Sequence, residues 1–141
     1  MLKDFLILKN ITLFILPYIF LYGVYVQING EISPGGGFQA GVIFASCLIG
    51  FNLIFGRILS AKYFDQNVLI IIATLGVLIY ASIGLISFFF NKNYLNYYVL
   101  VANKLTAQTI GIFIVEVGVG LTVASVMYLI YSLLDLPNIN Y

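Results

Sequence analysis

The sequence contains no histidine and one cysteine, and only 8% of its 141 residues are charged. Histidine and cysteine are the ligands that zinc, haem and iron–sulfur sites require, so we expect no metal site and no cofactor within this chain. Cys47 cannot form an internal disulfide and is expected to pack as a small apolar residue. No nucleophile has a base beside it, which argues against an enzyme.

Charge of either sign is also scarce. Six basic and five acidic residues give a net charge of +1. The chain therefore has no basic patch for nucleic acid and no acidic tail. A soluble domain averages about 25% charged residues, whereas here 62% of the residues are hydrophobic. This composition indicates an integral membrane protein.

Four apolar segments are long enough to cross about 30 Å of hydrocarbon. They predict an all-α fold, a bundle of four transmembrane helices that forms a single membrane domain over residues 1–141. Pro17 is expected to bend the first helix or to mark its first turns. The first segment has no cleavage site after it, so we interpret it as a retained helix. The predicted spans are 11–28, 38–55, 68–90 and 109–134.

Basic residues in the linkers predict the orientation, because cytoplasmic loops carry an excess of lysine and arginine. Four of them flank the spans on one side and two flank them on the other. Both termini are therefore expected in the cytoplasm, with linkers 29–37 and 91–108 on the outer side. The four are Lys3, Lys9, Arg57 and Lys62, and the two are Lys92 and Lys104.

Small residues recur at helical spacing in the second and fourth spans, which lets helix backbones approach closely. The fourth span has them on two opposite faces, so it is expected to lie between two neighbours. Four helices offer few neighbours, which favours contact with other subunits. The alternative is that glycine is simply frequent in membrane helices. The faces are Gly37, Gly41 and Ala45 in the second span, and Glu116, Gly120 and Ala124 opposite Gly111, Gly118 and Thr122 in the fourth.

A glycine run separates the first two spans: Pro34, Gly35, Gly36 and Gly37, followed by Phe38. Consecutive glycines cost backbone entropy. A membrane protein keeps them where backbone must approach something closely or turn sharply. The run has neither the lysine nor the spacing of a nucleotide-binding loop. Ser33 or Gly35 is expected to cap the second helix.

Glu116 is the one acidic residue deep inside a predicted span. Three roles are open to it: a proton or cation relay, pairing with a basic residue of another subunit, or a hydrated position near the interface. Lys104 lies about 18 Å away along a continuous helix, too far for direct pairing. Glu31 is either a solvated loop charge or a carboxylate at the entrance to an ion route.

Other polar side chains lie near the ends of the spans. Asn52, Gln27 and Gln108 are expected to bridge helices or to meet lipid headgroups. Tyr94 and Tyr97 interleave with asparagines after the third span, which is typical of an aromatic belt at the membrane interface.

Two stretches resemble a known family. Asn29–Ile43, with its Pro-Gly-Gly-Gly-Phe core, resembles the signature of the B-type (MnhB) subunit of multisubunit Mrp-type cation/proton antiporters, and 114–123 resembles that family's last-helix motif. The same domain occurs in membrane-bound hydrogenase-type complexes. Family members often carry a histidine just before the proline, and this chain lacks it. Glu31 is then a candidate to substitute for it.

The resemblance implies an accessory subunit that packs in the lipid bilayer beside larger antiporter-like subunits of a bacterial inner-membrane complex. The complex would exchange Na⁺, or another monovalent cation, for H⁺. Glu116 and Glu31 become candidates for the ion or proton pathway. The alternative is a structural membrane subunit of a hydrogenase or respiratory-type complex without ion-handling residues of its own. A third possibility is a small homo-oligomeric channel.

Overall fold

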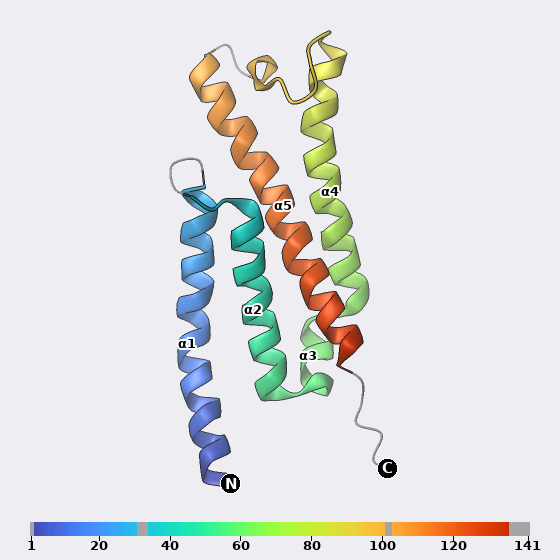
Figure 1. Ribbon diagram of the computed structural model, residues 1–141. Coiled ribbons are helices and arrows are strands. Elements are labelled where there is room, and N and C mark those ends of the chain that lie inside the picture. The colour runs from blue at the N-terminus through green and yellow to red at the C-terminus, as the bar shows by residue number, and fades with distance from the viewer. Residues whose placement is uncertain (1, 31–33, 101–102, 136–141) are drawn as a thin grey trace.

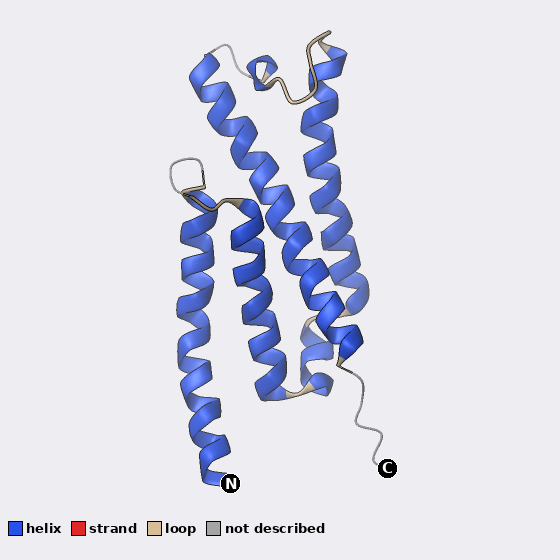
Figure 2. Cartoon of the chain, viewed as in Figure 1, coloured by secondary structure: helices blue, strands red, loops and turns tan. Residues whose placement is uncertain are grey.

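The computed structural model describes residues 2–30, 34–100 and 103–135, and the side chains of all of these except residues 2–5 and 104. The described residues form helices and loops, without a strand among them (Figure 2). The helices are α1 (Leu2–Ile28), α2 (Gly37–Phe55), α3 (Arg57–Tyr63), α4 (Gln66–Phe89) and α5 (Lys104–Leu134), with a short 3₁₀ helix, η1 (Tyr97–Val99).

Four of the helices, α1, α2, α4 and α5, are long and apolar enough to cross a membrane. The prediction of an all-helical protein with four spans is confirmed in this form. The apolar parts are Leu6–Ile28, Gly37–Phe55, Gln66–Phe89 and Leu105–Leu134. Pro17 lies in the interior of α1, so it does not mark that helix's first turns.

The segment expected to be a linker, residues 56–67, contains a helix, α3. Arg57 and Lys62 give it too much charge to stand out by hydropathy. Gly56 separates α2 from α3 with φ of 80°, a backbone conformation that residues with a β-carbon rarely adopt. Its amide still donates to the carbonyl of Asn52, at 2.8 Å, which closes the end of α2.

The four long helices lie side by side in the order α1, α2, α5, α4 (Figure 1). The extensive contacts join α1 to α2, α2 to α5, and α5 to α4. This arrangement is an open row rather than a closed bundle, with α1 and α4 at its edges. It confirms the prediction that the last long helix lies between two neighbours.

The two pairs of helices are staggered along the row. The end of α1 and the start of α2 lie far below the end of α4 and the start of α5 (Figure 1). Gly37, the first residue of α2, lies against Glu116 of α5. Since α5 begins at Lys104, α2 begins beside a point twelve residues along α5, about 18 Å from its start at 1.5 Å per residue.

Polar contacts close the end of the row where α2 meets α3. Asn52 of α2 donates to the hydroxyl of Tyr128 of α5 at 3.4 Å, and both side chains are buried. The prediction that Asn52 bridges helices is confirmed. The Arg57 guanidinium donates to the carbonyl of Asp135 at 2.6 Å, which ties α3 to the end of α5.

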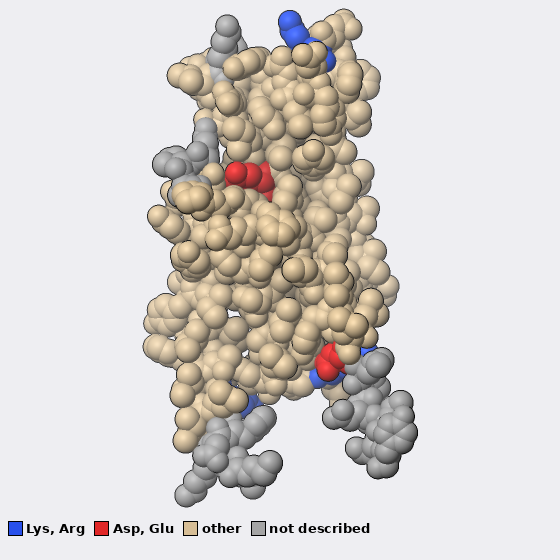
Figure 3. All heavy atoms as spheres, viewed as in Figure 1, with Lys and Arg blue, Asp and Glu red and all other residues tan. Residues whose placement is uncertain are grey.

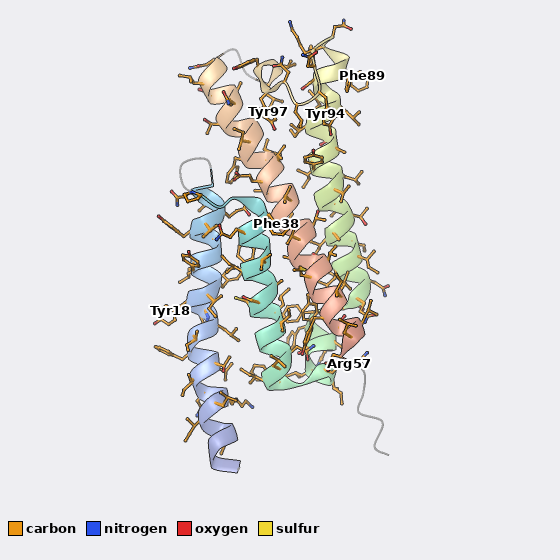
Figure 4. The ribbon with its side chains drawn as sticks, in the orientation of Figure 1. Tyr18, Phe38, Arg57, Phe89, Tyr94 and Tyr97 are labelled. Atoms are coloured by element: carbon orange, nitrogen blue, oxygen red, sulfur yellow. The ribbon has the colours of Figure 1, made fainter. Side chains whose placement is uncertain are left out.

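At the other end of the row, two tyrosines of the α4–α5 connection cover helix glycines (Figure 4). Tyr94 lies against Gly84 of α4, and Tyr97 lies against Gly111 of α5. Ser87 adds a hydrogen bond to the carbonyl of Asn96 at 3.1 Å. Burial, and then the neighbouring hydroxyl of Tyr80, raise the pKa of Tyr94 and of Tyr97.

Candidate functional site

Glu116 lies half-buried on α5, where its carboxylate meets the end of α1 and the start of α2. A β-carbon built on Gly36 would lie 2.8 Å from Oε1 of Glu116 and 3.2 Å from its Cδ. A β-carbon on Gly30 would collide with Oε2. The carboxylate therefore occupies space that exists only because residues 30 and 36 are glycines.

The first turn of α2 contacts the same turn of α5 backbone to backbone. A β-carbon on Gly37 would overlap the carbonyl oxygen of Glu116 and lie 2.7 Å from its carbonyl carbon. One turn on, a β-carbon on Gly41 would lie 2.8 Å from the carbonyl oxygen of Gly120. The small residues of the second span are thus used for contact with this chain's own α5.

The opposite face of α5 meets α4 in the same way. A β-carbon on Gly118 would lie 2.7 Å from the carbonyl oxygen of Gly76 and 3.2 Å from the amide nitrogen of Tyr80. The Thr122 hydroxyl donates across this contact to the carbonyl of Ala73 of α4 at 3.3 Å, and within α5 to the carbonyl of Gly118 at 2.9 Å. These two contacts fix α5, and hence Glu116, relative to both α2 and α4.

The glycine run supplies backbone conformations as well as space. Gly36 caps α2 with φ of 93°, and as a glycine it makes no side-chain capping hydrogen bond. The expectation that Gly35 caps the helix is therefore wrong, because the change to helical backbone comes one residue later. Pro34 and Gly35 are exposed beside it. Ser33 and Glu31 lie outside the described residues.

The carboxylate of Glu116 lies at the N-terminal end of α2, which carries a partial positive charge because its first amides have no helical partner. Such a position stabilises a negative charge. On the face that Figure 3 shows, acidic atoms lie in the upper middle, away from the basic groups, which are drawn near the two ends. The arrangement can hold a negative charge, exchange a proton or attract a cation.

Gln27 belongs to the same region, although sequence reasoning did not assign it to a site. Its Oε1 would lie 2.6 Å from a β-carbon on Gly120, one turn of α5 beyond Glu116. Its Nε2 is buried and has no hydrogen-bond acceptor within the described protein. One spacing could have suggested that Glu116 and Gly120 belong to the same contact: they are four residues apart and share a face of α5.

A groove of about 410 Å³ runs from Gln27 along α5. It is lined by all four long helices, and its walls are almost wholly apolar. Among the residues that the structure describes, no three histidine, cysteine, aspartate or glutamate side chains lie close enough together to hold a metal ion. The groove wall is formed by Phe20, Phe44, Cys47, Leu48, Leu69 and Leu121, among others.

Comparison with known proteins matches most of the chain. The family model "Domain related to MnhB subunit of Na+/H+ antiporter" matches residues 7–129. The proteins "Putative antiporter subunit mnhB2" of Staphylococcus aureus strains Newman and JH1 are each 30% identical over 128 residues. Each of these alignments covers 86% of this chain and 87% of the relative.

Proposed function

The chain belongs to the MnhB family of antiporter subunits, and on that premise we propose that it is an accessory membrane subunit of a multisubunit Na⁺/H⁺ antiporter. The observation that carries this proposal is the family match over residues 7–129, which includes all four candidate spans in whole or in large part. The chain is a multi-pass membrane protein, and we place it in the bacterial cell membrane.

The open row of helices supports a role as one subunit among several. In each span's most apolar window, between 17% and 28% of the residues are buried within the chain. The remaining apolar surface must face lipid or other subunits. We propose that larger antiporter-like subunits cover part of it, and that both termini lie in the cytoplasm, as the basic residues predict.

Purification of the tagged chain in mild detergent, with mass spectrometry of the proteins that accompany it, tests this function. We expect large multi-span antiporter subunits to be recovered with it. Recovery of the chain alone, or with hydrogenase subunits, would contradict the proposal. The antiport assay below then tests the pathway role of Glu116.

We propose further that Glu116 lies on the route of the transported ions. It is a carboxylate in the middle of the longest span, at the N-terminal end of α2 and beside backbone that only glycines allow. A carboxylate at such depth is costly unless it serves proton or cation movement or pairs with a partner. Glu31 stays a second candidate for the entrance of this route.

Glu116→Gln tests the relay, because glutamine keeps the shape of the side chain but can neither bind nor release the proton. We expect antiport to fall by roughly ten-fold or more, within the range that proton-transfer groups contribute. The measurement is Na⁺-driven proton movement in membrane vesicles. Asn52→Gln, at the far end of α2, serves as a control for changes that merely disturb packing. Antiport near the wild-type level in Glu116→Gln, with the complex intact, would exclude the relay.

A further inference from the structure

The stagger of the helices places the described part of the α1–α2 connection, residues 29–30 and 34–36, at the depth of the membrane. Beyond Glu116, α5 continues for about 18 Å toward its start. Over the half of this stretch nearer Glu116 the exposed side chains are apolar, Ile110 at 39% and Phe113 at 43%, whereas exposed polar side chains begin only at Thr109. The facing part of α4 is equally apolar, with Leu85 exposed at 53% and Phe89 at 85%. Apolar surface of this kind belongs in hydrocarbon, so the connection beside Glu116 lies below the membrane surface.

Non-helical backbone at that depth cannot face lipid, because lipid satisfies no amide or carbonyl group. It is tolerated where protein covers it or where it lines a water-filled cavity. Pro34 and Gly35 are non-helical and exposed here. The helices of this chain do not cover the backbone of Pro34 and Gly35, so water or another subunit must satisfy its polar groups.

Polar side chains gather at the same level, which favours water over an apolar covering. Gln39 is exposed, and its Oε1 would lie 2.9 Å from a β-carbon on Gly35. Glu116 is half-buried beside Gly36. Below them, the buried Nε2 of Gln27 needs an acceptor that the described protein does not supply, and buried groups of this kind are commonly satisfied by ordered water.

We propose that Pro34, Gly35, Gln39 and Glu116 line a hydrated recess that enters the membrane from the α4–α5 connection side. We call this the α1–α2 recess. It would bring water, protons and monovalent cations to Glu116 from one face of the membrane, while the apolar groove beyond Gln27 blocks passage to the other. The inference extends the proposed pathway role of Glu116, but its test does not depend on antiport.

Cysteine accessibility tests the recess in unsealed membranes that contain the chain with its partner subunits. The natural thiol is first removed by Cys47→Ser. Single cysteines then replace Gln39 or Glu116. The reagent is a charged, membrane-impermeant methanethiosulfonate, which reacts with the ionised thiol, and a thiol ionises only where water reaches it. We expect both cysteines to be labelled at least about ten-fold faster than cysteines that face lipid. Because Gln39 is exposed, Gln39→Cys is expected to leave the fold intact even if Glu116→Cys does not.

Two matched controls define depth. Leu78 is 57% exposed on α4 at the level of Gly118, since Gly76 and Tyr80 both contact Gly118. Leu85 is 53% exposed, seven residues and about 10 Å nearer the α4–α5 connection. Both face away from the row, so Leu78→Cys and Leu85→Cys should stay unlabelled in lipid.

Three results would overturn the recess. Labelling of Leu85→Cys as fast as Gln39→Cys would mean that the connection lies at the membrane surface. No labelling of Gln39→Cys would mean that another subunit covers the connection without water. Labelling of Leu78→Cys would mean that the outer face of α4 is itself hydrated. Co-purification of the same variants reports separately on the subunit assignment, so the two proposals can fail independently.

Discussion

At the scale of single residues, the site depends on the absence of a β-carbon at three glycines. Glu116 meets Gly30, Gly36 and Gly37, and a β-carbon at any of the three would lie within 3 Å of a Glu116 atom. Gly37 is the tightest, because there the obstacle is the backbone of α5, which cannot rotate away as a side chain can. The glycine run is therefore best explained by close approach and by the positive φ of Gly36.

Gly37→Ala should loosen the α2–α5 contact. Its methyl group would overlap the carbonyl of Glu116, and overpacking of this kind costs about 1–3 kcal/mol. We expect a lower thermal stability of the complex in detergent and reduced recovery of the chain with its partners. Gly50→Ala in the same helix is the control, because its nearest obstacle is the flexible end of Leu16, at 3.0 Å. Equal stability of the two variants would refute the close approach.

A second residue-scale effect concerns alkaline pH. Burial, followed by the hydroxyls of Tyr80 and Tyr94, raises the pKa of Tyr97 above its ordinary value, which is about 10. A pKa that is higher in the folded state contributes stability below the unfolded value, and this is lost as pH rises through the folded value. Tyr97 should therefore stay neutral, and its packing on Gly111 unchanged, from neutral pH to about 9.

Tyr97→Phe checks this directly, because phenylalanine can cover Gly111 but cannot ionise. We expect the loss of helical circular dichroism at high pH to begin at a higher pH in this variant than in the wild type. Tyr98→Phe is the control, since Tyr98 is 54% exposed. An alkaline transition that Tyr98→Phe shifts and Tyr97→Phe does not would contradict the assignment.

At the scale of elements, α5 organises the molecule. One face carries Gly120 against α2, and the other carries Gly118 against α4. Helices in membranes associate through close packing rather than through the hydrophobic effect, so such small-residue contacts decide which helices are neighbours. Sequence periodicity indicated both faces of this helix, but it could not say that the neighbours belong to the same chain.

Gly76→Val tests the α4–α5 contact. A β-carbon there would lie 2.5 Å from the carbonyl oxygen of Gly118 and 2.9 Å from the amide of Thr122. We expect a loss of about 1–3 kcal/mol, seen as a lower midpoint of thermal unfolding in detergent. Thr122→Val removes the hydrogen bond of the same contact without adding bulk, and it should cost only about 0.6 kcal/mol. A larger effect for Thr122→Val would show that hydrogen bonding, not close approach, holds the pair.

At the scale of the whole molecule, the open row leaves both edge helices with exposed apolar side chains. The outer face of α1 alone presents Phe14, Tyr18, Tyr22 and Tyr25, each more than half exposed. Tyr18 points away from the rest of the row (Figure 4). Partner helices that pack closely on these faces would add stability to the row.

Partner subunits should therefore stabilise the chain by mass action. A partner present at a hundred times its dissociation constant adds about 2.7 kcal/mol to the free energy of unfolding. We expect the chain to unfold at a lower temperature when isolated than in its complex, in the same detergent. Circular dichroism of the isolated chain, and thermal aggregation of the complex followed by immunoblot, measure this. Identical midpoints would mean that partners contribute nothing to its stability.

The sequence alone determined the number of spans, the helical fold and the family. These depend on local properties, because about twenty apolar residues must satisfy their own backbone to cross hydrocarbon. It also singled out Glu116 and the glycine run as candidates, and their roles stay predictions. The sequence did not predict α3, because its charged residues lower the mean hydropathy of that segment. It also predicted Gly35 as a cap of α2, one residue before the observed cap at Gly36.

Only the tertiary structure decided that Glu116 and the glycine run form one site. Gly36 and Glu116 are eighty positions apart in the chain, and no local pattern relates their depths. Their contact follows from the stagger of α1 and α2 against α5, which the fit of glycine backbones along the α2–α5 interface fixes. The place of Gln27 beside Gly120 has the same origin, since packing between helices depends on the shapes of two surfaces that the chain brings together only on folding.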